Sequence, residues 1–166
     1  MTRILSWLCA AMLLWSSPGL AAWADPPETG IPQALPLAPL TVETRNGDVL
    51  LRVQVADTDA TRQTGLMFRR SMPETEGMPF VFQQMRPVTF WMKNTVLPLD
   101  IIFVGGDGKV MNIARNTTPF SLDPIPSDGP ARVVVELNAG ASARLGIEPG
   151  DRVRYEPLAQ PAAGAP

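Results

Sequence analysis

The chain has 166 residues, 45% of them hydrophobic, and a formal net charge of −2, which suits one domain with a hydrophobic core. The slightly acidic balance argues against a general nucleic-acid-binding protein, so we expect no nucleic-acid partner. The sequence contains no histidine and a single cysteine, Cys9. Catalytic sites that need imidazole and zinc sites built on histidine are therefore excluded.

The N-terminal segment is predicted to be a signal peptide over residues 1–24. Arg3 precedes an almost wholly apolar run from Ile4 to Trp15, and the small residues Ala22 and Ala24 form a cleavage site. The run is too short to span a bilayer, although an uncleaved N-terminal anchor is the alternative. Cleavage would remove the only thiol, and we expect a periplasmic or secreted protein with no membrane span after the signal is removed.

Proline-rich segments border the remainder of the chain. Residues 25–39 contain five prolines and little periodicity, which predicts a disordered linker. Residues 157–166 form a Pro/Ala tail of the same kind. We therefore expect a single monomeric domain over residues 40–156.

The segments of this domain predict short strands and short helices in chain order. Asn46-Gly47 predicts a hairpin between strands over residues 41–45 and 49–55. Asp57 or Thr58 is expected to cap a helix over 60–64, which Gly65 would end. Further elements are expected as strands over 79–82, 88–93, 99–104, 109–113, 132–137 and 151–155, and a helix over 141–145.

This order of elements lacks the alternation of strands and helices that builds a parallel sheet. It predicts a mainly β (α+β) fold, a small antiparallel barrel or curled sheet with two short helices. A long loop over residues 116–130 holds four prolines and three apolar side chains. We expect this loop to pack over one end of the sheet.

The most hydrophobic segment, FWMKNTVLPLDIIF from Phe90 to Phe103, holds the polar residues Lys93, Asn94 and Asp100. A buried carboxylate needs hydrogen-bond partners, and turn N–H groups, Asn94 or Arg62 are the candidates for Asp100. Two roles remain open for Asp100, a carboxylate that fixes a turn or a group that faces a ligand.

A basic segment overlaps this region, because five cations and two anions lie between Arg62 and Lys93. It is either ordinary solvated surface or a patch that attracts a small anion. We predict a non-catalytic module that binds a small polar or anionic ligand, with no cofactor. The residues expected to line this ligand-binding mouth are Arg62, Trp91, Lys93, Asn94 and Asp100.

Methionines are frequent in the same region, with five of them between Met67 and Met92. Copper(I) binding by thioethers is one interpretation, but the spacings lack the close Met-x-Met pairs that such a site favours. We interpret these side chains as adaptable core filling and expect no metal site.

Two other functions are compatible with the sequence. An envelope protein–protein adaptor would present an exposed apolar patch formed by Phe68, Phe120 and Ile125. A carboxylate-dependent hydrolase would bring Asp100 and Glu136 into one cleft, within about 10 Å of each other. Whether the protein is an enzyme stays open, and the absence of histidine and thiol argues against it.

Several motifs in order resemble a bacterial and archaeal family, the domain of unknown function 192 family. They cover nearly the whole expected domain. The resemblance implies a compact β-rich fold, often behind an export signal, and it supplies no reaction or site roles. The motifs are Arg62-x-x-Gly65-Leu66-Met67, Glu76-Gly77-Met78-x-Phe80-x-Phe82, Phe90-Trp91-Met92-Lys93-Asn94-Thr95, Pro98-Leu99-Asp100-Ile101-x-Phe103 and Gly150-Asp151.

Overall fold

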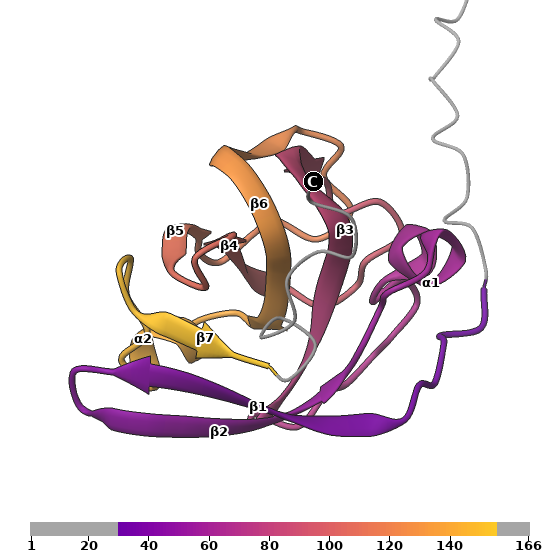
Figure 1. Cartoon of the computed structure of the whole chain (residues 1–166). Helices are drawn as coiled ribbons and strands as arrows, with labels where there is room; N and C mark the ends of the chain where they lie inside the picture. The colour runs from indigo at the N-terminus through magenta and orange to yellow at the C-terminus, as the bar shows by residue number, and fades with distance from the viewer. Residues whose placement is uncertain (1–29, 156–166) are drawn as a thin grey trace, which may run out of the picture.

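A curled seven-stranded sheet forms the framework of residues 30–155, which are the residues that the computed structural model describes (Figure 1). The strand order across the sheet is β5-β4-β6-β3-β2-β1-β7. The strands are β1 (Leu37–Thr44), β2 (Gly47–Gln54), β3 (Glu76–Phe90), β4 (Leu99–Gly105), β5 (Val110–Ala114), β6 (Ile125–Asn138) and β7 (Arg152–Arg154). Two short helices, α1 (Asp59–Thr64) and α2 (Ala141–Arg144), complete the fold.

The mainly β fold with two short helices is confirmed, and the curled sheet rather than the closed barrel describes it. The sheet is mixed, because β2 and β3 pair in parallel while the other neighbours are antiparallel. The edges at β5 and β7 meet only through the isolated bridge between Lys109 and Arg152 and a few backbone bonds beside it. A ladder of regular pairs is missing there, so the expectation of a barrel is wrong.

The first hairpin forms where the Asn46-Gly47 signal predicts it, with Thr44 paired to Gly47. Strand β1 starts at Leu37, earlier than the domain start at residue 40 that we expected. The preceding residues already pack on the domain: Gln33 Nε2 donates to the carbonyls of Thr61 and Gly65, at 2.9 and 2.8 Å. The latter part of the expected linker therefore belongs to the folded domain.

Helix α1 begins and ends at the residues that its sequence indicates. The Thr58 hydroxyl accepts a hydrogen bond from the Thr61 N–H, and the Thr61 hydroxyl accepts one from the Thr58 N–H, which makes a capping box. Gly65 ends the helix with a φ of 50°, in the region that favours glycine.

Strands β3 and β6 are longer than the sequence suggests. The segments expected as separate strands over 79–82 and 88–93 belong to one strand, β3, which ends at Phe90. Strand β6 begins at Ile125, so the expected loop over 116–130 ends early. The two strands pair with each other from Gly77↔Leu137 to Phe90↔Ile125. Because of this non-local pairing, prolines near the Phe90↔Ile125 end are part of the strands.

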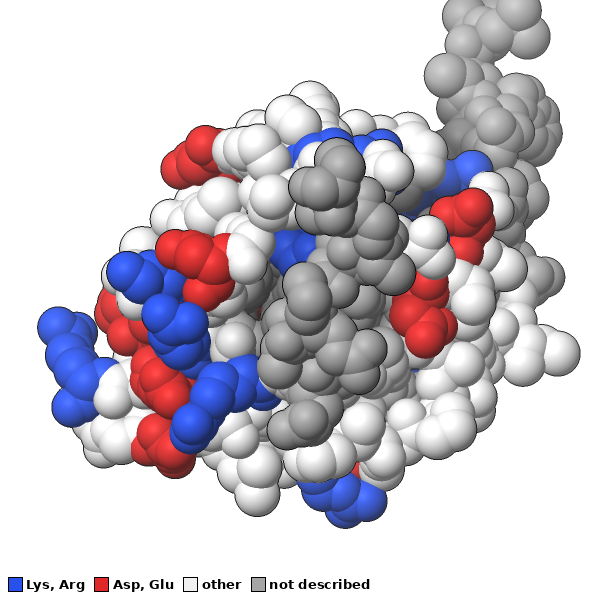
Figure 2. All heavy atoms as spheres, viewed as in Figure 1, with Lys and Arg blue, Asp and Glu red and all other residues white. Residues whose placement is uncertain are grey.

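The core lies on both faces of β6, whose side chains alternate between two hydrophobic clusters. Val133, Val135 and Leu137 pack into one cluster, and Val134 packs into the other. In the view of Figure 2, acidic and basic side chains interleave on the side of the molecule where β7 and the β1–β2 hairpin lie. The methionines behave partly as expected, since Met72, Met78 and Met92 are buried whereas Met85 is exposed.

The predicted signal peptide, its cleavage site and the Pro/Ala tail lie outside the described residues. Within residues 30–155, neither helix has the length and apolar character needed to cross a membrane.

Candidate functional site

Asp100 is completely buried on β4 and is held by four hydrogen bonds. Its Oδ1 accepts from the backbone N–H groups of Asn116 and Gly140, at 2.9 and 3.0 Å. Its Oδ2 accepts from the N–H and the hydroxyl of Ser142, at 3.0 and 2.6 Å. This carboxylate therefore fixes two loops and the start of α2, and its hydrogen-bonding capacity is filled.

The electrostatics of Asp100 agree with this arrangement. Burial alone would raise the pKa of Asp100, but the hydrogen bonds from Ser142, Asn116 and Gly140 outweigh it and leave the pKa below its ordinary value. The Ser142 hydroxyl also accepts from Arg115 Nε at 3.2 Å, and Arg115 Nη2 forms an ion pair with Glu148 at 3.0 Å. A polar network thus fixes α2 to the sheet.

A cleft of about 670 Å³ opens between α1, β3 and the turn that follows β3, and we call it the Glu136 cleft. It brings together residues that are distant in the sequence. Its polar and charged lining residues include Asp59, Arg62, Arg86, Lys93, Asn94 and Glu136, and its aromatic ones include Phe68, Phe80, Phe82, Phe90 and Trp91.

The floor of the Glu136 cleft is aromatic. The rings of Phe80 and Phe90 meet edge to face with centroids 5.0 Å apart, and Phe90 meets Phe103 in the same way at 6.0 Å. Gly65 lies against this floor, because a Cβ there would come within 3.1 Å of the Phe80 ring. With its φ of 50° and this close approach, Gly65 lets α1 end against β3, and a larger residue there would be strained and would displace the Phe80 ring.

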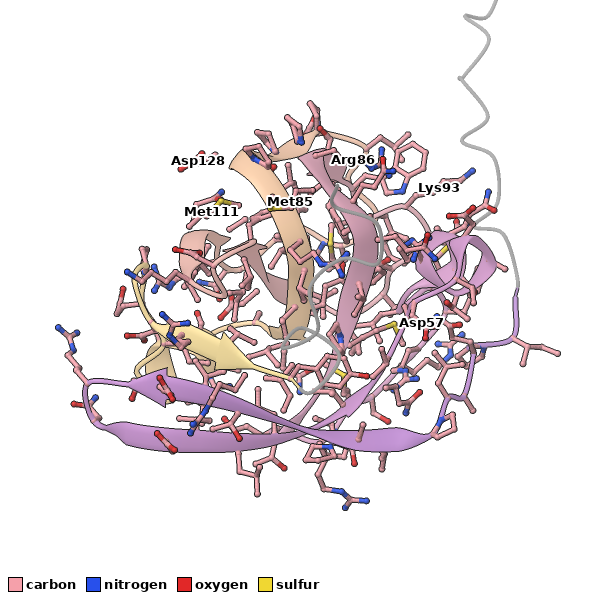
Figure 3. The ribbon with its side chains drawn as sticks, viewed as in Figure 1. Asp57, Met85, Arg86, Lys93, Met111 and Asp128 are labelled. Atoms are coloured by element: carbon pink, nitrogen blue, oxygen red, sulfur yellow. The ribbon has the colours of Figure 1, made fainter. Side chains whose placement is uncertain are left out.

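The rim of the Glu136 cleft is cationic, and Figure 3 shows Arg86 and Lys93 on the side of the molecule that carries α1. The Lys93 ammonium lies 5.9 Å from the Trp91 ring centroid, and the Arg86 guanidinium lies 5.4 Å from that of Phe82. Trp91 is about half exposed, and neither cation forms an ion pair within the described residues. The rim therefore presents two uncompensated positive charges beside exposed aromatic surface.

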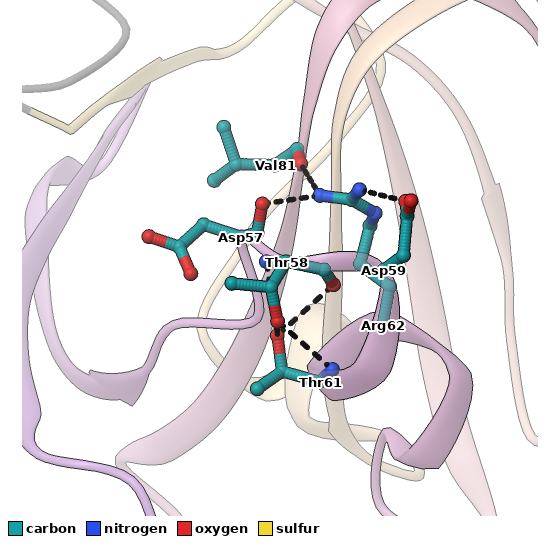
Figure 4. A network of polar contacts seen from close by, with 6 residues as sticks. All are labelled: Asp57, Thr58, Asp59, Thr61, Arg62 and Val81. Atoms are coloured by element: carbon teal, nitrogen blue, oxygen red, sulfur yellow. Dashed lines mark hydrogen bonds and ion pairs between the residues drawn. The ribbon is translucent and has the colours of Figure 1, made fainter.

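Arg62 has a different environment, although it lines the same cleft (Figure 4). Its Nη1 donates to the carbonyls of Asp57 and Val81, at 2.5 and 2.7 Å, and its Nη2 pairs with Asp59 at 2.5 Å. Its guanidinium also lies 5.4 Å from the Phe82 ring centroid. Arg62 therefore fastens α1 to β3 and forms the wall of the cleft.

Three segments at or beside the Glu136 cleft contain a residue with an unusual backbone conformation. Phe68, Asn94 and Phe120 have φ values of 64°, 54° and 61°, a region that bulky side chains rarely adopt. The Phe68 N–H donates to the Asn94 carbonyl at 2.8 Å, and the Phe120 N–H donates to the Thr95 carbonyl at 3.2 Å. Such strain often accompanies functional sites, and here it lies at and beside the cleft.

Glu136 is the least usual residue of the cleft, because its side chain is 4% exposed and lies among apolar neighbours. Its strand partners are Met78 and Ile101, and no described residue forms a hydrogen bond or an ion pair with its carboxyl group. Burial raises the pKa of Glu136 to about 8. Near neutral pH the carboxyl group is therefore largely protonated, so it can both donate and accept a hydrogen bond.

Comparison with known proteins places this chain in a family. The family profile described as "Uncharacterized ACR", DUF192, matches residues 41–155. The chain belongs to the DUF192 family. Its resemblance to this family, inferred from the motifs, is thereby confirmed.

Two solved structures resemble this DUF192 protein. A protein of unknown function from Novosphingobium aromaticivorans is 45% identical, with a TM-score of 0.71 over 77% of this chain and 95% of that one. A protein from Sinorhizobium meliloti, described as a candidate transcription regulator, is 42% identical, with a TM-score of 0.69 over 74% of this chain and 97% of that one. No functionally curated protein matches.

The DUF192 fold brings four of the five expected site residues, Arg62, Trp91, Lys93 and Asn94, to one cleft and leaves Asp100 out. Backbone N–H groups do hold Asp100, but they come from distant segments instead of the Asn94 turn. Arg86 and the aromatic floor were not predicted as parts of a site from the sequence, and Glu136 was expected there only as a catalytic partner of Asp100. The sequence does carry a signal for Glu136, because it is the single charged residue in the apolar run Val133-Val134-Val135-Glu136-Leu137.

The residues expected to form the apolar patch of an adaptor are arranged differently from what that function needs. Phe68 and Ile125 are partly buried and only Phe120 is half exposed, so the three do not form one exposed patch. Residues 30–155 contain no cluster of acidic residues that could hold a metal ion.

Proposed function

We propose that this protein is a non-catalytic module that binds a small organic anion in the Glu136 cleft. The observation that carries the proposal is the nearly buried carboxyl group of Glu136, which lines a cleft with a cationic rim and has no hydrogen-bond partner among the described residues. A buried polar group normally has a hydrogen-bond partner, because leaving it unpaired costs about 1–3 kcal/mol. A ligand would supply the missing partner.

The lining of the cleft indicates the chemistry of this ligand. Arg86 and Lys93 favour a carboxylate or a similar anionic group at the rim. The rings of Phe80 and Phe90 favour a flat apolar body below it. Protonated Glu136 favours a polar atom at the far end that can accept or donate a hydrogen bond.

A binding role accounts for this cleft more directly than hydrolysis does. Hydrolysis by a carboxylate pair needs both carboxyl groups in one cleft, where they flank the scissile bond, whereas Asp100 lies on the face of the sheet opposite to Glu136 and is engaged there. The export signal and the periplasmic or secreted location remain part of the proposal, and they rest on the N-terminal sequence.

The experiment is a calorimetric titration of the full chain with 4-hydroxybenzoate, which combines a carboxylate, a flat ring and a terminal hydroxyl. We expect binding near pH 6.5 that weakens as the pH rises through 8, because an ionised Glu136 repels the anion and loses its donor. The double substitution Arg86→Gln with Lys93→Gln should weaken binding about tenfold or more. Glu136→Gln should remove the pH dependence.

The matched control is Lys109→Gln, a cation that lies outside the lining of the cleft. Affinity for 4-hydroxybenzoate should be unchanged in this variant. The proposal fails if the double variant binds as well as the Lys109 control, or if neither 4-hydroxybenzoate nor benzoate binds the wild-type protein at millimolar concentration.

A further inference from the structure

A second cleft, which we call the Arg132 cleft, lies where the two edges of the sheet approach each other. It has a volume of about 540 Å³ and no lining residue in common with the Glu136 cleft. Its walls are the turn between β4 and β5 and the strands β1 and β7, and Arg132 enters it from β6. The Val153 N–H donates to the Gly108 carbonyl at 2.8 Å and holds the two walls together.

Arg132 occupies an irregular position in the middle of the sheet. Val133 pairs with Val81 on one side and Val104 on the other, and Ala131 pairs with Arg86 and Gly105, so Arg132 has no opposing residue on either neighbour. Such a bulge redirects a side chain, and bulges are frequent next to functional sites. Here it directs a guanidinium to the Arg132 cleft.

The Arg132 guanidinium is not fully satisfied. Its Nη1 atom has almost no solvent-accessible surface and no hydrogen-bond partner, and it is the one side-chain nitrogen or oxygen in the described part of the chain that combines the two. Arg132 also forms no ion pair within residues 30–155. A buried donor on a charged group is costly when unpaired, and an anion in the cleft would satisfy it.

The other charges of the cleft leave it positive. Arg154 is neutralised by Glu43 at 2.9 Å and Asp48 at 3.2 Å. Arg152, in contrast, donates from Nη1 to the backbone carbonyl of Asp107 at 3.0 Å and has no carboxylate partner among the described residues. The Asp107 side chain accepts from the Lys109 N–H and is the single acidic group in the lining.

We propose that the Arg132 cleft is a binding site for an oxyanion, either a phosphate group or a carboxylate group, held by the guanidinium groups of Arg132 and Arg152. The planar guanidinium group of arginine can donate to two oxygens of such an anion. The bulge in β6 brings Arg132 to the cleft, and β7 brings Arg152 to it. This site is independent of the Glu136 cleft and of any ligand bound there.

The test is the thermal unfolding of the full chain in inorganic phosphate, in acetate and in chloride at equal ionic strength. We expect phosphate or acetate to raise the Tm above its value in chloride, and the responding anion identifies the preferred oxygen geometry. Arg132→Gln should abolish this specific shift, and Arg132→Lys should weaken it because lysine cannot donate in a fork. Arg45→Gln, at the exposed tip of the β1–β2 hairpin, should keep it.

Two results would overturn the proposal. One is an equal Tm in all three salts for the wild-type protein. The other is an unchanged phosphate or acetate shift in Arg132→Gln, with folding verified by circular dichroism. If that variant does not fold, Arg152→Gln decides, because it removes the second guanidinium group of the cleft and should reduce the shift. Glu136→Gln must leave this response intact, which separates the outcome from that of the proposed function.

Discussion

Asp100 and Glu136 lie on adjacent antiparallel strands, offset by one position, and their carboxyl groups leave the sheet on opposite faces. Asp100 pairs with Leu137 and Ile101 pairs with Glu136, and residues directly opposite each other share a face. One carboxyl group is ionised and holds four hydrogen bonds, whereas the other is protonated near neutral pH and has no described partner. The same sheet thus separates a structural carboxylate from a candidate binding group.

Asp100→Asn should destabilise the protein by about 2–4 kcal/mol at pH 7, because the amide NH₂ cannot accept the hydrogen bonds from Ser142. The pKa of Asp100 is lower in the folded state than its ordinary value of 3.8, so this stabilisation is present above that pH and is lost as the pH falls below it. Urea unfolding from pH 3 to 7 measures the difference. Asp128→Asn, at an exposed position, is the control, and an equal effect of both would contradict the account.

Arg62 and Arg86 flank the same ring, and their substitutions should separate a structural from a binding role. Arg62→Gln should lower the free energy of unfolding by about 1–3 kcal/mol, because it removes two hydrogen bonds to carbonyls and an ion pair. Arg86→Gln should change it by less than about 0.5 kcal/mol, because Arg86 is exposed. Chemical denaturation checks both, and a larger loss for Arg86→Gln would refute the assignment of roles.

Phe120→Asn should leave the protein as stable as the wild type or stabilise it by up to about 1 kcal/mol. Asparagine tolerates the φ of 61° at this position, and the half-exposed ring loses little buried area. Leu122→Asn is the matched control, since Leu122 is exposed and has no positive φ. A clear loss of stability in Phe120→Asn alone would mean that the ring, and not the backbone, anchors this loop.

Glu136→Gln should be more stable than the wild type above neutral pH. The pKa of Glu136 is about 8 in the folded protein and has the ordinary value of 4.5 in the unfolded chain. The free energy of unfolding of the wild type therefore decreases as the pH rises from 4.5 to 8. The advantage of glutamine should grow over that range, to a few kcal/mol, and vanish near pH 4. A difference that is constant with pH would show that Glu136 is ionised in the folded protein.

Local signals in the sequence predicted the elements that depend on neighbours in the chain. The hairpin at Asn46-Gly47 and the cap of α1 at Thr58 need only a few consecutive residues, and both are confirmed. The parallel pairing of β2 with β3 and the extension of β6 to Ile125 depend on contacts between distant segments, which periodicity does not report.

The same distinction applies to the candidate site. Lys93 and Asn94 line the cleft because they lie in the turn after β3, and their local context already indicated a turn. The partners of Asp100 come from Asn116, Gly140 and Ser142, across the sheet, so its role could not be decided beforehand. The role of Arg132 was not predicted, because a bulge depends on how the neighbouring strands pair and has no signature in its own residues.

The most direct test of the Glu136 cleft is a carbon-13 NMR titration of the Glu136 carboxyl group, assigned with Glu136→Gln, in the absence and presence of saturating 4-hydroxybenzoate. We expect a midpoint near pH 8 for the free protein and a higher midpoint with the ligand, because an anion bound in the same cleft favours the protonated form of the carboxyl group. A midpoint near the ordinary 4.5 that 4-hydroxybenzoate leaves unchanged would contradict both the protonation state and the proposed binding role.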